Sequence, residues 1–554
     1  MKRILGIILI VVMLLPTLAV ASEGFNDVPA SSWAVDEINS AVNYGLMEGM
    51  GDGQFGYGRT ISRAEFVTVL VRMFGYDTHI EGSSFSDVDE DSWYRPYIEA
   101  ALKNGVIDEG TSFMPDTPIV RRDMAVMLVK ALGYEGIAED AAGYEIPFDD
   151  VTVDRGYITV AYDLGIINGT SESTFDPENT AKREEAAAML VRVYEKLEGE
   201  IEWLHGFYAF SSYSQRSLIS DMDAVSAGWS RLNFDLENGA WLNTGYTDDN
   251  YWAIPESYED IISYMETYST PLNLNVYMDT SEQITLLDGS STSALNYMLT
   301  SANYRSQAIT AIMTEVTRTY EKIGKNPYSG VTIDFEGLKG ESVKSGFNAF
   351  LSELNVQLKE HDLSLYVAVQ PALNSGEYYD GFDYKMIGQI ADKVILMAHD
   401  YNARSMDGFV GSEYYKTSAL TPIDRVYYSL RKILDPNTGV QDASKVAIAI
   451  SFSSIGWQID ENGKLLSATS IQPGGETLSN RMAQEDTEFG WSEEYKNPYI
   501  ICYDDDGNRW YVYYEDSRSV DEKIKLARMF GITGVSVWRL GTVPQFENYT
   551  VDFS

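Results

Sequence analysis

Residues 329–338 read SGVTIDFEGL, an apolar run that ends in two carboxylates. Apolar side chains alternate with other residue types, and this period of two predicts a strand with one buried face. Asp334 and Glu336 end the opposite face and lie roughly 7 Å apart along the strand. We interpret them as side chains projecting into the end of a barrel, although a solvated strand end is the alternative.

Seven more segments resemble this strand in length and composition, and helical stretches separate them. The eight predicted strands are residues 203–210, 225–234, 272–278, 330–335, 365–369, 393–397, 446–452 and 534–538. Strands alternating with helices predict a parallel sheet, and eight of them in about 350 residues predict an α/β fold, a (β/α)8 TIM barrel in residues 201–554. The active site of such a barrel lies at the carboxyl ends of the strands, where Asp334 and Glu336 are expected.

Length, charge and cysteine content narrow the function classes. The 554 residues exceed one hydrophobic core, so at least two domains are expected. A net charge of −42 repels phosphate backbones, which argues against a nucleic-acid partner and requires a local basic site for any anionic ligand. The single Cys502 excludes internal disulfides, and four scattered histidines argue against zinc. We expect neither a metal nor an organic cofactor.

Residues 1–21 have the pattern of a signal peptide. Lys2 and Arg3 precede a long apolar run, and small residues at positions 19–21 form a cleavage pattern. An uncleaved membrane anchor is the alternative, but Pro16 and the small residues favour removal. We therefore expect a secreted protein with no stable membrane span after signal cleavage.

Three similar units occupy residues 22–80, 81–140 and 141–200. Each begins with Phe-x-Asp-Val and continues with an aromatic residue, an amphipathic helix, a glycine turn and a second apolar helix. An arginine stands at the start of each second helix. These are Arg63, Arg121 and Arg183. A guanidinium beside the free N–H groups of a helix N-terminus would bind an anion, and a structural ion pair is the alternative.

The units resemble S-layer homology (SLH) domains, through the Phe-x-Asp-Val start and the Ser-Arg-Ala-Glu sequence at residues 62–65. The resemblance implies a mostly α-helical three-repeat bundle with pseudo-threefold symmetry. It also implies attachment to the bacterial cell wall or S-layer, because Arg63, Arg121 and Arg183 would bind an anionic secondary cell-wall polysaccharide. Val120 and Lys182 depart from the expected Ser or Thr at the helix start.

Paired carboxylates at a barrel mouth suit hydrolysis of a glycosidic bond. One carboxylate raises the pKa of its neighbour and keeps a proton available near neutral pH, as a sugar leaving group requires. Two more segments fall at the same predicted end of the barrel. They are Met-Ala-His-Asp-Tyr at residues 397–401, and residues 534–541, which include Trp538.

Together these three segments resemble glycoside hydrolase family 18 over about residues 201–554. The resemblance implies a chitinase or an endo-β-N-acetylglucosaminidase, with Glu336 as the general acid. It implies that Asp334 holds the acetamido group of the substrate and that Asp400 steadies it. Trp538 would form the floor of the sugar site, with core packing as the alternative for this residue.

Three residues depart from the family motif. Ser329 and Thr332 stand where the family has aspartates, so the carboxylate relay behind the catalytic pair is missing. His399 replaces a tyrosine, and an imidazole can still donate a hydrogen bond to a carbonyl, although a purely structural histidine is the alternative. Tyr401 is a second source of the missing phenol.

The resemblances imply a wall-anchored glycoside hydrolase that cleaves β-1,4 linkages next to N-acetylglucosamine, in chitin-like chains or peptidoglycan. They further imply substrate-assisted retaining catalysis, in which the acetamide of the sugar attacks the anomeric carbon while Glu336 protonates the leaving oxygen. A non-catalytic chitin- or peptidoglycan-binding surface protein and a structural surface-layer subunit are the alternatives. The sequence leaves chitin against peptidoglycan, and endo against exo action, open.

Overall fold

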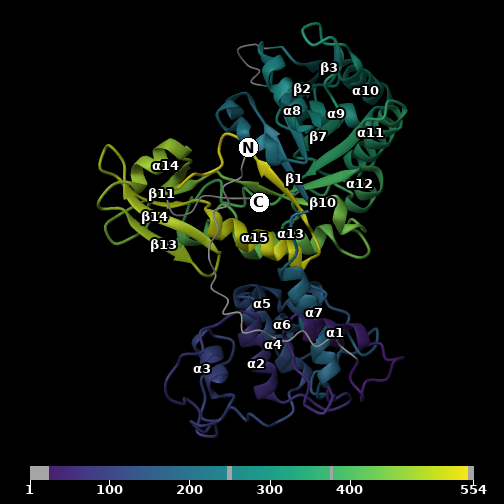
Figure 1. Cartoon of the computed structure of the whole chain (residues 1–554). Coiled ribbons are helices and arrows are strands. Elements are labelled where there is room, and N and C mark those ends of the chain that lie inside the picture. Colours follow the sequence, from purple (N-terminus) through teal and green to yellow (C-terminus); the bar gives the residue numbers. More distant parts are fainter. Residues whose placement is uncertain (1–23, 246–251, 375–378, 547–554) are drawn as a thin grey trace. The chain divides into compact units, whose positions relative to one another are not determined.

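The computed structural model describes residues 24–245, 252–374 and 379–546 (Figure 1). The predicted signal peptide lies outside these residues. Within them, no helix combines the length and the apolar character needed to cross a membrane. Contacts divide the chain into two units, and we describe each unit by itself.

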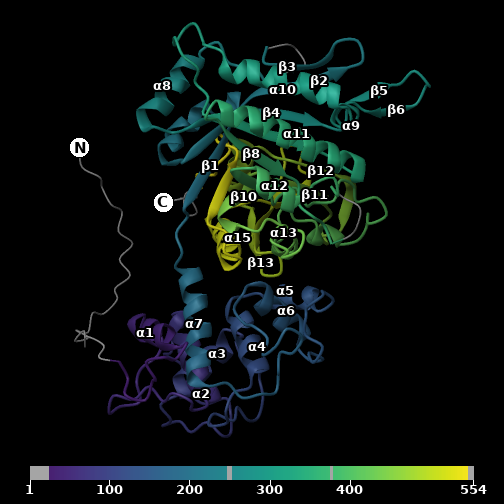
Figure 2. The same ribbon diagram turned by 90° about the vertical axis from the view of Figure 1, so that its right-hand side faces the viewer.

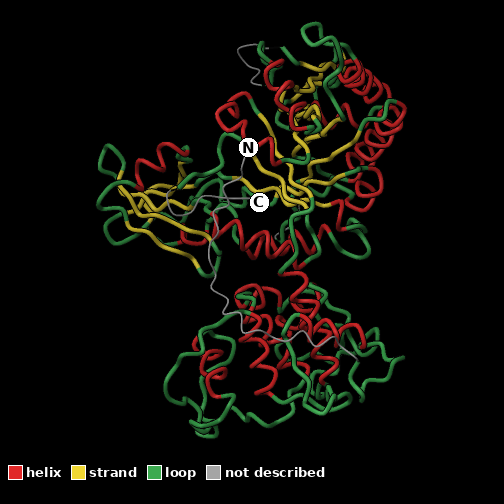
Figure 3. Tube along the Cα trace, viewed as in Figure 1, coloured by secondary structure: helices red, strands yellow, loops and turns green. Residues whose placement is uncertain are grey.

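The first unit consists of helices joined by long loops, as Figure 3 shows. Its helices are α1 (Val35–Asn43), α2 (Arg63–Met73), α3 (Arg95–Lys103), α4 (Arg121–Ala131) and most of α7 (Arg183–Leu197). Short bridges pair residue 60 with 182, 62 with 118, and 120 with 180. Because these bridges link the first repeat to the third, the first to the second and the second to the third, the repeats close into a ring.

The second unit contains the barrel, and its sheet is parallel and closed. The barrel strands are β1 (Trp203–Tyr208), β2 (Ala224–Asp235), β4 (Leu272–Asp279), β7 (Gly330–Glu336), β8 (Ser364–Val369), β9 (Lys393–Met397), β10 (Val446–Ser451) and β16 (Gly534–Trp538). Strand β1 pairs with both β2 and β16, which closes the sheet. All eight predicted strands are confirmed, and the barrel agrees with the predicted fold class.

Helices lie around the outside of the barrel (Figure 1, Figure 2). They are α8 (Tyr258–Tyr268), α9 (Ala294–Thr300), α10 (Ala302–Thr317), α11 (Glu341–Glu360), α12 (Tyr384–Ile390), α13 (Ile423–Ile433) and α15 (Ser517–Met529). Two further helices also belong to this unit: α5 (Glu135–Ala141), at the end of the predicted second repeat, and α6 (Arg155–Asp163) of the predicted third repeat. The ion pair between Arg431 of α13 and Asp163 of α6, at 2.7 Å, joins them to the barrel.

Shorter elements are inserted between the first strands of the barrel in chain order. The 3-10 helix η1 (Phe210–Asp221) follows β1, and strand β3 (Gly239–Asn243) forms an antiparallel hairpin with β2. Strands β5 (Gln283–Thr285) and β6 (Ser291–Ser293) form a separate two-stranded hairpin. These additions leave the carboxyl end of β7 within the barrel sheet, between β4 and β8.

An insertion between β10 and α15 forms a small domain that the sequence analysis did not predict. It consists of β11 (Ile455–Ile459), β12 (Leu465–Ile471), α14 (Gly475–Met482), β13 (Glu488–Ser492), β14 (Asn497–Tyr503) and β15 (Arg509–Tyr513). The five strands form one antiparallel sheet in the order β12-β11-β15-β14-β13. Trp457 and Tyr511 belong to the apolar cluster on one face, and Ile500 and Val512 to the cluster that includes Leu478 of α14.

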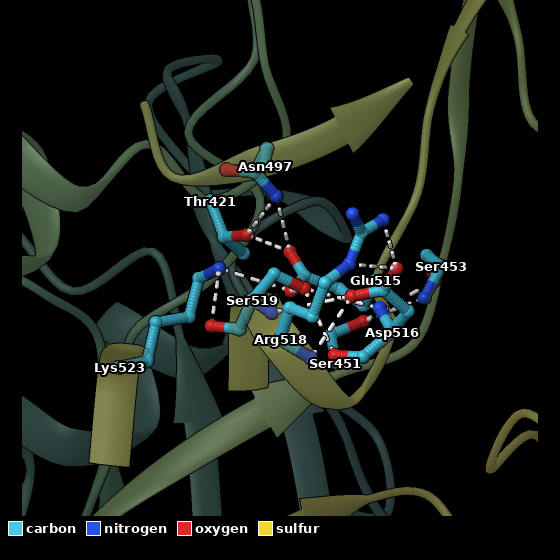
Figure 4. A network of polar contacts seen from close by, with 9 residues as sticks. All are labelled: Thr421, Ser451, Ser453, Asn497, Glu515, Asp516, Arg518, Ser519 and Lys523. Carbon is cyan, nitrogen blue, oxygen red and sulfur yellow. Dashed lines mark hydrogen bonds and ion pairs between the residues drawn. The ribbon is translucent and has the colours of Figure 1, made fainter. Parts of the chain in front are cut away.

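A buried polar network joins this insertion to the barrel (Figure 4). Glu515, which follows β15, accepts a hydrogen bond from Nζ of Lys523 at 2.9 Å and from Nδ2 of Asn497 at 2.8 Å. The Glu515 and Lys523 side chains are each 1% exposed. Thr421, which precedes α13, donates its hydroxyl to the same carboxylate. The network therefore connects β14, β15, α13 and α15 at one point.

Candidate active site

Strand β7 presents its two carboxylates as the alternation predicts. Phe335 points outward and packs against Phe347 and Phe350 of α11, with ring centroids 5.9 and 5.3 Å away. Asp334 lies on the opposite, inner face and is 1% exposed, while Glu336 is partly exposed at the end of the strand. The outward phenylalanine thus fixes the direction of both acids toward the barrel axis.

Burial dominates the electrostatics of Asp334. It raises the pKa of Asp334 to about 6, against the opposing effects of a hydrogen bond from Asn275 and the charge of His399. Asn275 Nδ2 donates to Oδ2 at 3.3 Å. The other oxygen, Oδ1, is buried and accepts no hydrogen bond from the described residues, and it therefore remains an acceptor for a ligand.

Glu336 is the more strongly shifted acid. Burial raises its pKa to about 8, and the charges of Asp334, Asp279 and Asp400 add to this shift. Asp279 ends the neighbouring strand β4, in register with Glu336. Asp279 was not among the predicted site residues, although its segment also ends in a carboxylate after an apolar run, as β7 does.

Hydrogen bonds keep Asp279 ionised. Burial acts to raise its pKa, but hydrogen bonds from Ser281 and Tyr277, together with the charge of Arg231, lower the pKa below its ordinary value. The Tyr277 hydroxyl donates to Oδ2 at 2.7 Å. Glu336 consequently faces a carboxylate that stays negative while Glu336 itself holds its proton.

His399 and Asp400 follow strand β9 and form a contact pair. Nδ1 of His399 lies 2.9 Å from Oδ2 of Asp400, and Nε2 is buried with no hydrogen-bond partner among the described residues. The His399 ring lies nearly parallel to Trp538, with centroids 6.5 Å apart and an interplanar angle of 15°. Trp538 also contacts Phe207 at 4.9 Å. The structure thus brings the ends of β1, β9 and β16 together.

Tyr401 does not join this group, and we withdraw its predicted role. Its hydroxyl lies 2.8 Å from Oγ of Ser429 in α13, and its backbone carbonyl accepts a hydrogen bond from Arg425 of the same helix. Asp400 has a φ of 62°, in the left-handed region. That turn directs Tyr401 toward the helix layer.

A neutral network replaces the missing carboxylate relay. Oγ1 of Thr332 lies 2.6 Å from Ser226 Oγ, which lies 2.7 Å from Nε2 of His205, and Nδ1 of His205 lies 2.8 Å from Ser536 Oγ. All four side chains are fully buried, and burial lowers the pKa of His205 to about 3. Among the described residues this network contains no acidic side chain beneath Asp334, and Ser329 precedes the strand.

A cavity of about 440 Å³ adjoins the Trp538 side of the barrel mouth. Its lining includes Gln215, Phe452, Ser454, Glu476, Gly541 and Phe546. These residues come from η1, from the segments after β10 and β16, and from α14 of the insertion. In the part of the chain that the structure describes, no group of three or more His, Cys, Asp or Glu side chains could hold a metal ion.

The three repeat arginines occupy equivalent positions in the first unit. The guanidinium of Arg63 stacks on the Phe113 ring at 5.0 Å from its centroid, and Nε donates to the Phe113 carbonyl at 3.0 Å. Arg121 makes the same two contacts with Phe175, and Arg183 makes them with Phe55. Each arginine thus reaches into the next repeat around the ring, which also fits the structural alternative.

The backbone N–H groups at these helix starts are not free, contrary to our expectation. The N–H of Arg63 donates to the Thr117 carbonyl at 3.0 Å, and those of Arg121 and Arg183 donate to Asn179 and Arg59. Closure of the ring supplies these acceptors. Carboxylates also approach two of the guanidinium groups. The pairs are Arg63 with Asp123 and Arg183 with Glu65.

Comparisons with known proteins agree with this architecture. The family profile of glycosyl hydrolases family 18 matches residues 283–542, and the S-layer homology domain matches residues 24–67, 84–125 and 147–187. The chain is 34% identical over 179 residues to an amylopullulanase of Thermoanaerobacterium thermosulfurigenes, covering 31% of this chain and 10% of the relative. It is 29% identical to an S-layer protein of Bacillus thuringiensis subsp. finitimus, covering 33% of this chain and 23% of that protein.

A third relative matches a longer segment. The chain is 25% identical over 247 residues to a cortical fragment-lytic enzyme of Bacillus anthracis, covering 43% of this chain and 53% of that enzyme. The chain spans between a tenth and about half of the length of these curated relatives. With the closed barrel and the repeat ring, the matches show that this protein contains three S-layer homology domains followed by a domain of glycosyl hydrolases family 18.

Proposed function

We propose that the protein is a secreted glycoside hydrolase, attached to the cell wall, that cleaves β-1,4 linkages next to N-acetylglucosamine in peptidoglycan or chitin-like chains. The observation that carries this proposal is the Asp334–Glu336 pair at the barrel mouth. Burial raises the pKa of both acids, and the charge of Asp334 adds to the shift of Glu336, so that Glu336 keeps a proton near neutral pH. A solvated strand end would give neither acid such a shift.

The residues around the pair support substrate-assisted catalysis with retention. Ionised Asp334 would accept a hydrogen bond from the acetamide N–H at its open Oδ1, which orients the acetamide oxygen toward the anomeric carbon. As an imidazolium, His399 would donate from Nε2 to the acetamide oxygen or a neighbouring hydroxyl, while Nδ1 donates to the Asp400 carboxylate. Trp538 would provide an apolar face beneath the sugar ring.

The reaction then proceeds in two steps. The acetamide oxygen forms a bond to the anomeric carbon as the glycosidic C–O bond breaks and Glu336 transfers its proton to the leaving oxygen. Glu336, now ionised, removes a proton from a water molecule that attacks the same carbon. This attack breaks the bond between the acetamide oxygen and the anomeric carbon and so opens the ring that the acetamide had formed. The β configuration is restored, and Glu336 recovers its proton. Neither step requires a metal or an organic cofactor.

Attachment to the wall is proposed for the S-layer homology repeats. Their three arginines carry positive charge into an otherwise acidic chain, and an anionic secondary cell-wall polysaccharide is the partner that such sites would bind. The S-layer protein among the relatives supports this assignment, since it shares this similarity over 33% of the chain. The Bacillus anthracis relative, whose name is cortical fragment-lytic enzyme, supports a cell-wall-associated substrate for the barrel.

The decisive test of hydrolysis is Glu336→Gln. The amide keeps the shape of the side chain but cannot donate the proton, so turnover should fall by at least about a hundredfold while binding of N-acetylglucosamine oligomers persists. Release of products from peptidoglycan and from chitin, identified by mass spectrometry, measures the effect. Unchanged turnover would place the acid elsewhere, and binding without turnover in the native chain would support the non-catalytic alternative.

A further inference from the structure

Arg539 is a half-buried cation that no acidic side chain neutralises among the described residues. It directly follows Trp538, and its Nη1 donates a hydrogen bond to Oγ of Ser211 in η1. Burial lowers the pKa of Arg539, and no carboxylate within the described ranges offsets this shift. A partly desolvated charge without a counter-ion is unfavourable, so a ligand that supplies the counter-ion would gain binding energy there.

Several other shielded arginines of this chain have a carboxylate as a partner. Arg431 pairs with Asp163 at 2.7 Å, Arg63 pairs with Asp123, and Arg183 lies 3.5 Å from Glu65. The chain has 83 acidic residues against 41 basic ones, so acidic side chains outnumber the cations about two to one. The open guanidinium of Arg539 is therefore a local basic site of the kind that an anionic ligand requires.

The position of Arg539 links it to the sugar site. It lies in sequence between Trp538 and Gly541, which lines the cavity beside the barrel mouth. Ser211, its hydrogen-bond partner, is flanked by Phe210, whose side chain is 66% exposed. Exposed aromatic rings provide apolar faces for sugars. A glycan that extends from Trp538 toward Phe210 would therefore pass the Arg539 guanidinium.

We propose that Arg539 binds a carboxylate carried by the glycan substrate and so favours acid-bearing strands over uncharged N-acetylglucosamine chains. This inference rests on the proposed function of the same site. The acids Asp279, Glu336 and Asp400 stand on the ends of β4, β7 and β9, whereas Arg539 follows β16. A substrate with a neutral sugar at the reacting bond and a carboxylate on the adjacent sugar would match this distribution of charge.

The two candidate substrates, chitin and peptidoglycan, differ in whether they carry carboxylates. Chitin carries no carboxylate, whereas every second sugar of a peptidoglycan strand carries a lactyl ether whose carboxyl group is either free or extended by a peptide that bears its own carboxylates. A guanidinium can bind such a carboxylate with two parallel hydrogen bonds, which a glutamine amide cannot reproduce. Arg539 would then be the residue that decides between the two polymers.

The test compares kcat/KM for three soluble oligosaccharides of equal length with the full chain. The first is an alternating strand with free lactyl carboxylates, the second is the same strand with stem peptides, and the third is the first with its carboxyl groups reduced to alcohols. Arg539→Gln should lower the preference for the free-carboxylate strand over the reduced strand by about ten- to a hundredfold. Arg539→Lys should retain part of it.

The outcomes separate the inference from the proposed function. Arg404→Gln, which removes an exposed arginine from the segment after β9, is the matched control and should leave the preference unchanged. If the native chain cuts the free-carboxylate and reduced strands equally, or if Arg404→Gln has the same effect as Arg539→Gln, the assignment of Arg539 is wrong although the chain is a hydrolase. If only the strand with stem peptides is preferred over the reduced strand, the carboxylate that Arg539 binds belongs to the peptide.

Binding resolves the case in which no strand is cut. Calorimetric titration of Glu336→Gln with the free-carboxylate and reduced strands, repeated with Arg539→Gln added, reports recognition without turnover. Tighter binding of the acidic strand that requires Arg539 would support the inference even if the proposed hydrolysis fails. Equal binding of both strands would overturn it.

Discussion

Asp334 and Glu336 share one strand face, yet their surroundings assign them different tasks. Asp334 is enclosed, holds a hydrogen bond from Asn275 and keeps an oxygen open, which suits an anion that orients the substrate. Glu336 stands at the rim beside Asp334 and Asp279, and their charges add to burial in raising its pKa. The two apparent pKa values of this pair are near 6 and 8. Between these pH values the pair holds one proton, on Glu336, while Asp334 is ionised, and this is the state that the mechanism requires.

Asp279→Asn tests this electrostatic arrangement. Removing a negative charge beside Glu336 makes ionisation of Glu336 easier, so its pKa should fall. The alkaline limb of the kcat/KM profile should then move to lower pH, by about half to one unit, while the acid limb changes less. Asp288→Asn removes an exposed carboxylate near the β5–β6 hairpin and is the control. An alkaline limb that stays in place would show that Asp279 does not act on Glu336.

At the residue scale, the sequence could predict which acids point inward but not every neighbour that they meet. The period of two in β7 placed Asp334 and Glu336 correctly on the inner face. The left-handed turn at Asp400 is a backbone property that the spacing of residues in the sequence does not predict. Because of this turn, the Tyr401 hydroxyl contacts Ser429. Likewise, the partners of Thr332 come from β1, β2 and β16, far away in the chain.

At the scale of elements, the eight barrel strands were predictable because each contains a segment rich in apolar residues and helical stretches separate them. The insertion was not, because its strands are partly exposed and its helix α14 spans only eight residues. Its attachment point could not be predicted either. Glu515 and Lys523 are charged residues that a sequence places on the surface, and only the fold buries them together.

Lys523→Met tests the role of this attachment point. The substitution leaves the Glu515 carboxylate buried without its cation, which should reduce the free energy of unfolding by about 3–5 kcal/mol. Chemical denaturation followed by fluorescence measures the loss. The double variant Glu515→Gln with Lys523→Met removes both charges and should recover a large part of it. A single variant as stable as the native chain would mean that Lys523 is dispensable.

At the scale of the whole molecule, the proposed function assigns attachment and hydrolysis to different segments of the chain. The repeats and the barrel were both predictable from internal similarity and strand pattern. The division of the chain into two units was not predictable, because α5 of the second predicted repeat and α6 of the third belong with the barrel unit. Asp163 of α6 pairs with Arg431 of α13, and nothing in the repeat motif signals that pairing.

Replacing Arg63, Arg121 and Arg183 by alanine tests the attachment. The chain should be released from purified cell walls, while hydrolysis of soluble oligosaccharides continues, because the catalytic pair lies in the barrel. Sedimentation with walls measures retention, and thermal unfolding checks that the repeats stay folded. The triple lysine variant retains the charge and should keep part of the binding. Full retention of the alanine variant would show that these arginines only connect the repeats.

The central claim is that Glu336 and Asp334 assist an attack by the substrate's own acetamide. The most direct measurement is time-resolved proton NMR of the products released from N-acetylglucosamine oligomers, with de-N-acetylated oligomers of equal length in parallel. The account predicts that the β-anomer appears first and that the de-N-acetylated oligomers remain intact. Initial release of the α-anomer, or comparable cleavage of both sets of oligomers, would contradict it.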